Sequence, residues 1–129
     1  MGIRLFIGGR AQGKLNYVLQ KYHLGDEIVW DGGKMQQALP PGSIIIVNHF
    51  HDWVRQKMME GNCPEERVSL LTERYEECIF ICDEVGNGIV PGDAQEGEYR
   101  ERLGRMLVEL AGKAEIVERI LCGIGQKIK

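Results

Sequence analysis

Residues 8–15, which read GGRAQGKL, have the residue types and spacing that most clearly indicate chemistry. As far as Lys14 they follow G-x-x-x-x-G-K-[ST], the pattern of a loop that binds phosphate between a strand and a helix. Glycines let successive backbone N–H groups converge on a phosphate at a helix N-terminus, and the lysine adds a positive charge. The predicted binding residues are Gly8, Gly9, Arg10, Ala11, Gln12, Gly13, Lys14 and Leu15.

Leu15 stands where the pattern has a serine or threonine. In a complete loop of this type, that hydroxyl ligates the magnesium ion that bridges the terminal phosphates. Because leucine offers no oxygen, we expect phosphate to bind while placement of a metal depends on other groups. The alternative is a glycine-rich turn that carries a solvated lysine and no ligand.

Asp83 and Glu84 are the other candidate residues, because they directly follow the apolar run at 78–82. In open α/β sheets, ligands bind beyond the carboxyl ends of the strands, so this pair could face the same crevice as the loop. Asp83 could then hold a metal or a metal-bound water. Alternatively, Asp83 caps its loop and Glu84 pairs with a nearby base. The candidate catalytic residues are therefore Lys14, Asp83 and Glu84.

Short apolar runs that alternate with amphipathic segments must position these residues. The runs predict strands at 3–7, 27–30, 43–47, 78–82 and 115–124. Helical spacing predicts helices at about 13–22, 48–60, 64–77 and 95–114, with a brief helix or turn at 31–39 and a loop at 83–93. Fully apolar strands that alternate with helices predict an α/β fold with a largely parallel sheet of about five strands.

The composition is that of an ordinary globular protein. A chain of 129 residues is expected to form one domain, here 1–129. A formal net charge of −3 argues against nucleic acid as a partner, because proteins that bind the phosphate backbone usually carry a strong basic excess. No run approaches the roughly 20 apolar residues of a membrane helix, so we expect a cytoplasmic protein that does not bind membranes.

The cysteines show no metal-type C-x-x-C spacing. Cys78 and Cys82 lie four apart in an apolar run, where a strand would point both to the same face. We expect these and also Cys63 and Cys122 to be small buried hydrophobic residues rather than disulfide or zinc ligands.

Three segments resemble a known family. They are EVGNGIVP at 84–91, YRERLGR at 99–105 and the tail CGIGQKIK at 122–129. Together they look like the C-terminal half of the bifunctional adenosylcobinamide kinase/adenosylcobinamide-phosphate guanylyltransferase family of cobalamin biosynthesis, and the loop at 8–14 is similar to the start of that family. The resemblance implies a RecA-like, three-layer P-loop fold and homo-oligomers with sites at subunit boundaries. It also implies a nucleotide-dependent enzyme that phosphorylates the aminopropanol hydroxyl of adenosylcobinamide and then attaches GMP.

The functional residues of that family carry over unevenly. The loop serine is Leu15 here, and the loop arginine appears one position early as Arg10. Asp83 stands where the family has Asn or Ser, and Leu107 and Val108 replace an Asn-Gln pair. The positions that match or substitute conservatively are Gly8, Gly9, Gly13, Lys14, Glu84, Val85, Gly86, Gly88, Ile89, Val90, Pro91, Tyr99, Arg100, Gly104 and Arg105.

A shortened segment removes the residue that the family guanylylates. That histidine belongs between the second and third strands, where this chain has only DGGKMQQALPPG. After the third strand, Asn48 and His49 stand in place of an acid and a cysteine-threonine segment. His49 and His51 lie on the next predicted helix, where i, i+2 spacing points them to different faces, so we expect one of them to pack or to face water.

We therefore predict a divergent family member that binds GTP or ATP, with magnesium binding weakened by Leu15. Lys14 and the loop backbone would bind the phosphates, and Asp83 or Glu84 would lie near the metal and the acceptor hydroxyl of a cobinamide-type corrinoid. The guanylyltransferase step would be lost. The alternatives are a noncatalytic nucleotide-binding or regulatory protein, and an assembly partner that retains only the fold.

Overall fold

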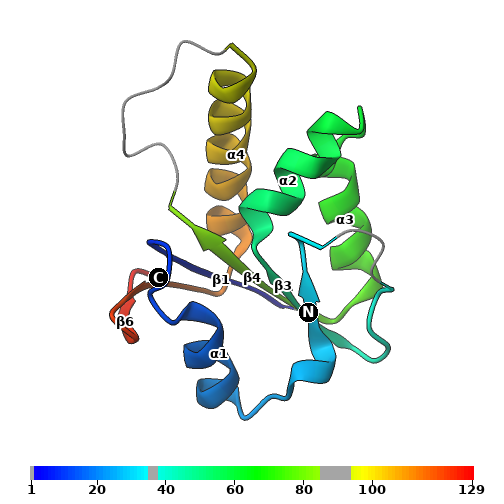
Figure 1. Ribbon diagram of the computed structural model, residues 1–129. Helices are drawn as coiled ribbons and strands as arrows, with labels where there is room; N and C mark the ends of the chain where they lie inside the picture. Colours follow the sequence, from blue (N-terminus) through cyan, green and yellow to red (C-terminus); the bar gives the residue numbers. More distant parts are fainter. Residues whose placement is uncertain (1, 35–37, 85–93) are drawn as a thin grey trace.

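The computed structural model describes residues 2–34, 38–84 and 94–129 (Figure 1). Its strands are β1 (Gly2–Gly8), β2 (Val29–Asp31), β3 (Ile44–Asn48), β4 (Glu77–Asp83), β5 (Ile116–Leu121) and β6 (Ile124–Lys127). Its helices are α1 (Lys14–Tyr22), α2 (Phe50–Met59), α3 (Pro64–Arg74) and α4 (Ala94–Lys113), with a short 3₁₀ helix, η1 (Asp26–Ile28). Most of the predicted loop at 83–93, which contains the family-like segment at 84–91, lies outside the described residues, as do positions 35–37.

The strands form one sheet in the order β2-β3-β4-β1-β5-β6. All neighbouring pairs are parallel except β5 and β6, which are antiparallel. The register places Gly8 at the end of β1 opposite Asp83 at the end of β4. It also places Asp31 at the end of β2 opposite Asn48 at the end of β3. Four carboxyl ends therefore meet along one edge of the sheet, as the sequence predicted for a parallel fold.

Helices cover both faces of this sheet and make three layers (Figure 1). The larger core lies between the sheet and α2, α3 and α4, and it includes Leu5, Phe80 and Leu103. The smaller core lies under α1 and includes Phe6 and Val18. Neighbouring strand residues such as Leu5 and Phe6 are buried in opposite cores, which confirms that the central strands are apolar because both of their faces are covered.

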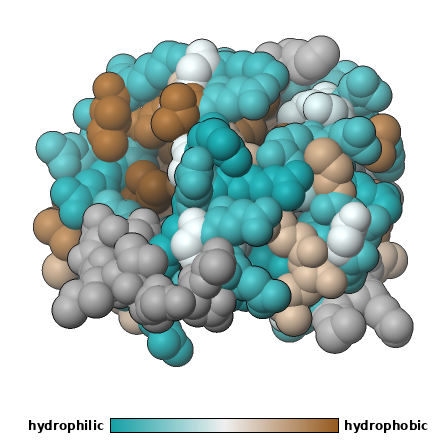
Figure 2. Space-filling model, turned by 90° about the horizontal axis from the view of Figure 1, so that it is seen from above, coloured by the Kyte–Doolittle hydropathy of each residue, from teal (hydrophilic) through white to brown (hydrophobic). Residues whose placement is uncertain are grey.

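Figure 2 shows the molecule from above the view of Figure 1. Hydrophilic side chains cover most of the described surface on this side, and hydrophobic side chains gather in small separate patches. Within the described residues, no helix combines the length and the apolar character needed to cross a membrane.

The C-terminal strand differs from the prediction. The sequence predicted a single strand at 115–124, but the chain reverses after Leu121 and returns as β6, so the described sheet has six strands. Cys122 and Gly123 adopt left-handed conformations with φ of 50° and 74°. Positive φ at both central residues is the geometry of a tight two-residue hairpin. The prediction was wrong here because Cys-Gly is not among the usual sequence signals for that turn.

Other differences concern element ends and cysteines. Residues 27 and 28 belong to η1 rather than to the second strand, and α3 ends at Arg74 because Tyr75 is extended and leads into β4. Cys78 and Cys82 are buried on the same face of β4, as predicted. Cys63 is only half-buried and Cys122 is exposed in the hairpin turn, so the expectation of four buried cysteines was wrong.

Phe50 is the clearest test of the larger core, because it is 0% exposed and its ring packs 5.2 Å from that of Phe80 and 5.8 Å from that of Trp53. We expect Phe50→Ala to lower the free energy of unfolding by about 3–5 kcal/mol, from lost burial and the remaining cavity. Urea denaturation followed by circular dichroism measures this. Val108→Ala, at a position 75% exposed on α4, should change stability by less than about 0.5 kcal/mol. Equal losses in both variants would contradict the assigned core.

Candidate functional site

Two glycines shape the loop between β1 and α1. Gly8 lies so close to β5 that a Cβ atom there would be 2.4 Å from the carbonyl oxygen of Ile120. Gly13 precedes α1 with a φ of 77°, a conformation that favours glycine. Two glycines of the predicted motif are therefore required by the local structure, and the chain enters α1 directly at Lys14.

Gln12 attaches this loop to the β5–β6 turn. Its side-chain Oε1 accepts a hydrogen bond from the backbone N–H of Cys122 at 2.7 Å, and its carbonyl oxygen accepts one from Gly123 at 2.9 Å. Gln12 was predicted to bind nucleotide through the backbone of the loop. In the structure its side chain contacts the turn, which supports the shape of the loop.

A cavity of about 700 Å³ opens beside the loop. It lies at the edge of the sheet where the carboxyl ends of β1, β3 and β4 meet, as expected for an open α/β sheet. The residues that line it come from the loop, the first turn of α1, the connection from β3 to α2 and the end of β4. They are Arg10, Ala11, Gln12, Gly13, Lys14, Leu15, Asn16, Asn48, His49, His51, Asp52 and Asp83.

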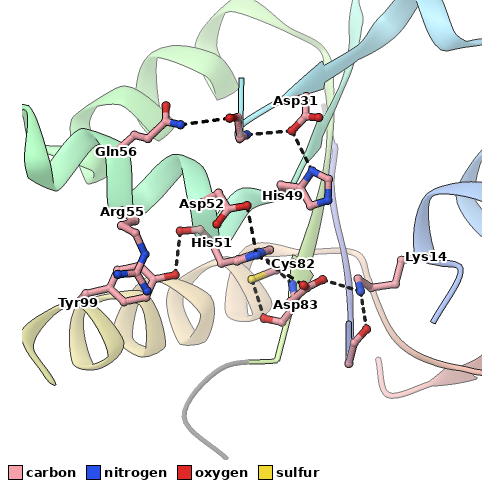
Figure 3. A network of polar contacts seen from close by, with 12 residues as sticks. Lys14, Asp31, His49, His51, Asp52, Arg55, Gln56, Cys82, Asp83 and Tyr99 are labelled. Atoms are coloured by element: carbon pink, nitrogen blue, oxygen red, sulfur yellow. Dashed lines mark hydrogen bonds and ion pairs between the residues drawn. The ribbon is translucent and has the colours of Figure 1, made fainter. Parts of the chain in front are cut away.

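Lys14 and Asp83 are brought together in this cavity (Figure 3). Lys14 is 7% exposed, and its Nζ lies 2.7 Å from Asp83 Oδ1 and 2.7 Å from the carbonyl oxygen of Gly9. The alternative of a solvated lysine is therefore excluded. A buried ammonium needs such partners, because burying an unpaired charge is costly.

Glu84 lies elsewhere. Its carboxylate pairs with Arg119 of β5, with Oε1 3.0 Å from Nε, and its backbone N–H donates to the carbonyl oxygen of Gly8 at 2.8 Å. Glu84 is not among the described residues that line the cavity. Of the three candidate catalytic residues, the structure thus brings together Lys14 and Asp83, and it places Glu84 in an ion pair with a base.

His51 faces the two carboxylates on its side of the cavity. Its Nε2 lies 3.5 Å from Asp83 Oδ2 and 3.6 Å from Asp52 Oδ2. The backbone N–H of Asp83 donates to its Nδ1 at 3.3 Å, so Nδ1 is unprotonated and the neutral ring carries its proton on Nε2. Burial lowers the pKa of His51, and the negative charges of Asp52 and Asp83 only partly offset that effect.

His49 is held by Asp31. Its Nδ1 lies 2.8 Å from Asp31 Oδ1, and the same oxygen accepts the backbone N–H of Gly33 at 2.8 Å. Burial alone would raise the pKa of Asp31, but the hydrogen bonds from His49 and Gly33 outweigh it and lower the pKa. Asp31 is therefore a carboxylate at neutral pH, and Nδ1 of His49 donates to it.

The two histidines lie on the same cavity, although they were predicted to point to different faces. The side chain of His49 is 44% exposed and faces water, as was expected of one of the two. Their ring centroids are 6.0 Å apart, and both side chains line the space beside Lys14 (Figure 3). The i, i+2 spacing of a helix did not apply to His49 and His51, because α2 begins at Phe50 and His49 precedes it. The sequence interpretation also missed Asp31 and Asp52. Asp31 ends a strand just as Asp83 does, so the strand-end rule applied to Asp83 could have found it.

The lowered pKa of His51 makes the free energy of unfolding depend on pH. Its ring stays neutral in the folded protein, whereas the unfolded chain takes up a proton near the ordinary value of 6.5. The difference in protonation between the two states adds to the free energy of unfolding, and this addition is complete above the ordinary value. It is lost as the pH falls towards the lower folded-state pKa, by up to about 1.4 kcal/mol per pH unit.

We therefore expect wild type to lose more stability than His51→Gln between pH 7 and pH 5. Glutamine can still accept the backbone N–H of Asp83 but does not titrate. Urea denaturation at several pH values measures the difference. The same pH dependence in both proteins would show that His51 protonates equally well in the folded state.

Comparison with known proteins agrees with the resemblance in the sequence. A family model described as "Cobinamide kinase / cobinamide phosphate guanyltransferase" matches residues 31–128, a range that starts at the end of β2 and contains His49 and Asp83. The bifunctional adenosylcobalamin biosynthesis protein CobU of Salmonella typhimurium is 32% identical over 69 residues, which are 50% of this chain and 38% of that protein. The chain thus aligns with less than half the length of this curated relative.

The family match begins after the loop at 8–15, so the assignment of that loop depends on its own residues and geometry. The match nevertheless spans β3, β4, β5 and β6 and the helices between them, which is most of the chain. The resemblance found in the sequence is thereby confirmed, and the chain belongs to the cobinamide kinase / cobinamide phosphate guanyltransferase family.

Proposed function

We propose that this protein binds a nucleoside triphosphate, GTP or ATP, and transfers the terminal phosphoryl group to a hydroxyl of a cobinamide-type corrinoid. One observation supports the proposal above all others. The buried ammonium of Lys14, at the N-terminus of α1, faces a cavity of about 700 Å³ that also contains Asp83. A positive charge and a helix N-terminus at one end of a cavity favour an anionic ligand.

The ammonium group of Lys14 has one N–H donor available for a phosphate oxygen. An ammonium group has three N–H donors, and Gly9 and Asp83 accept two of them. The third donor could point to phosphate without breaking either contact. α1 also has no acidic residue in its first turn, so no carboxylate of the helix itself opposes an anion there.

Magnesium bound with the nucleotide would neutralise charge on the terminal phosphates. Leu15 lines the cavity and supplies no oxygen, whereas Asp83 offers a carboxylate beside Lys14. In the described residues, no group of three or more His, Cys, Asp and Glu side chains forms a metal site. Mg²⁺ usually keeps several waters and uses one or two carboxylates plus phosphates. We propose that it enters with the nucleotide and meets Asp83 directly or through water.

The corrinoid substrate is proposed from family membership. The family description names a kinase and a guanyltransferase activity, and the cavity beside Lys14 supports the proposal of the first. We propose that guanylyl transfer is lost, because the segment between β2 and β3 contains no histidine. We also propose a homo-oligomer, as the family resemblance implies.

A noncatalytic nucleotide-binding protein is the second candidate. Leu15 favours it, because this side chain replaces a magnesium ligand, and so does Asn48, because it ends β3 where the family has an acid. Such a protein would bind nucleotide in the same cavity and transfer nothing. Binding and turnover must therefore be measured separately.

Nucleotide binding is the first test. We expect GTP or ATP to stabilise wild type, by about 2.7 kcal/mol at 100 times the dissociation constant, and Lys14→Ala to lose this effect. Thermal shift and calorimetry, each with and without magnesium, measure it. Lys113→Ala is the matched control, because Lys113 lies in an exposed pair with Glu109 far along α4. If wild type shows no stabilisation by either nucleotide, the proposed function is wrong.

Turnover is the second test. With adenosylcobinamide as acceptor, we expect wild type to form nucleoside diphosphate and phosphorylated corrinoid. Asp83→Asn should lower the rate roughly a hundredfold or more, because it removes one preorganised charge from the site. Nucleotide binding without any product would support the noncatalytic candidate. Label from α-labelled GTP that stays on the protein would contradict the loss of guanylyl transfer.

A further inference from the structure

We propose that His49 is the general base of the phosphoryl transfer and that Asp31 is the residue that positions it. The inference rests on the proposed function, because it names the group that takes the proton from the acceptor hydroxyl. Three observations on His49 support it: its contacts, its backbone conformation and the direction of its ring.

The Asp31–His49 pair is built into the sheet edge. Asp31 ends β2 opposite Asn48, which ends β3, so His49 follows directly from the neighbouring strand. The N–H of Gly32 donates to the carbonyl oxygen of Asn48 at 2.8 Å, and Gly33 fixes the Asp31 carboxylate. A Cβ atom at Gly32 would lie 2.7 Å from the carbonyl oxygen of His49. The two segments are thus packed too closely for either to shift independently.

The backbone of His49 has an unusual conformation for its position. His49 precedes the first residue of α2 and has φ 55° and ψ 49°, in the left-handed region. Residues at this position normally have extended backbone, and left-handed conformations of residues other than glycine are uncommon. Such strain is found mostly at functional sites. Here it accompanies an imidazole that lines the cavity beside Lys14.

The contact with Asp31 determines which nitrogen can accept a proton. Because Nδ1–H donates to the carboxylate, the lone pair of the neutral ring is on Nε2. Within the part of the chain that the structure describes, Nε2 has no hydrogen-bond partner. Figure 3 shows it turned away from Asp31, on the side of the ring towards Lys14 and Asp83. The side chain is 44% exposed, so a proton that it accepts can pass to water.

Neither His51 nor Asp83 is placed as well for this role. Nδ1 of His51 already accepts the backbone N–H of Asp83, and its Nε2–H faces carboxylates. Asp83 has one oxygen on Lys14 and the other near His51. The two neighbouring histidines therefore hold opposite tautomers, and only that of His49 presents a lone pair to the cavity.

The proposed transfer forms one bond to phosphorus and breaks another. The oxygen of the acceptor hydroxyl attacks the terminal phosphorus, and its proton moves to Nε2 of His49. The bond from phosphorus to the bridging oxygen breaks, and its electron pair leaves with the nucleoside diphosphate. Asp31 then faces the imidazolium on the Nδ1 side, and the ring returns its proton to water. Asp31 of β2 contacts the ring, and the other charged and titratable groups are those of the cavity lining, namely Arg10 from the loop, Lys14 from α1, His51 and Asp52 from α2, and Asp83 from β4.

The tautomers can be tested without any activity. Long-range ¹H–¹⁵N correlation spectra of protein labelled at histidine distinguish Nδ1–H from Nε2–H, and His49→Gln and His51→Gln variants assign the signals. At a pH where both rings are neutral, we expect Nδ1–H for His49 and Nε2–H for His51. An Nε2–H tautomer at His49 would overturn the proposal, because no lone pair would then face the acceptor.

Kinetics with GTP and adenosylcobinamide test the role itself. We expect His49→Gln to lower kcat by about 100- to 10,000-fold while GTP binding, measured by calorimetry, stays as in wild type. Asp31→Asn should reduce kcat less than His49→Gln and add the Nε2–H tautomer of His49 to the ¹H–¹⁵N spectrum, because a neutral amide holds Nδ1–H less strongly than a carboxylate does. His23→Gln is the matched control, because His23 is exposed and also left-handed, but lies at the C-terminal end of α1.

The outcomes separate the two proposals. An active wild type together with a fully active His49→Gln variant overturns the role of His49 and leaves the proposed function intact. A wild type that binds GTP but phosphorylates no corrinoid overturns both. If His49→Gln loses turnover only because it no longer binds GTP, the ring acts in binding, and the assignment as general base is wrong.

Discussion

The ion pair between Lys14 and Asp83 is the contact on which the rest of the site depends. It exists because β1 and β4 are parallel neighbours and end in register, with Gly8 opposite Asp83. A one-residue shift of that register would move Asp83 to the other face of the sheet and leave the buried ammonium without its carboxylate. The pair therefore links the packing of the central strands to the position of the one buried cation beside the cavity in the described chain.

The same edge of the sheet supplies the other half of the site. β2 and β3 end in register as β1 and β4 do, and their carboxyl ends place His49 on the far side of the cavity and Asp31 beside His49. The loop side presents a helix N-terminus and Lys14 to the cavity, whereas the opposite side carries imidazoles and carboxylates that can hold protons. An anionic ligand on the first side would thus meet proton-accepting groups on the second.

Much of this arrangement could be predicted from the sequence, because it follows from hydrophobic patterning and strand ends. The apolar runs located the central strands, and the glycine pattern located the loop and Lys14. Pairing of Glu84 with a nearby base was one of two alternatives from the sequence, but its partner in β5 could not be predicted. The contacts of Gln12 could not be predicted either, since they depend on a turn that the sequence did not reveal. The neighbouring positions of His49 and His51 were missed for a local reason. A single left-handed residue before α2 turns the first ring into the cavity, and residue spacing does not encode that conformation.

Charge balance indicates what the ligand itself must bring. Arg10 and Lys14 are the basic residues of the cavity lining, Asp52 and Asp83 are the acidic ones, and burial keeps His51 neutral. The lining as described is thus close to electrically neutral. A triphosphate carries several negative charges, so the side chains alone cannot neutralise it. The amides of the loop and the N-terminus of α1 supply only partial charges. If the ligand is the triphosphate proposed above, further positive charge would have to enter with it, because Leu15 offers no oxygen to hold a metal.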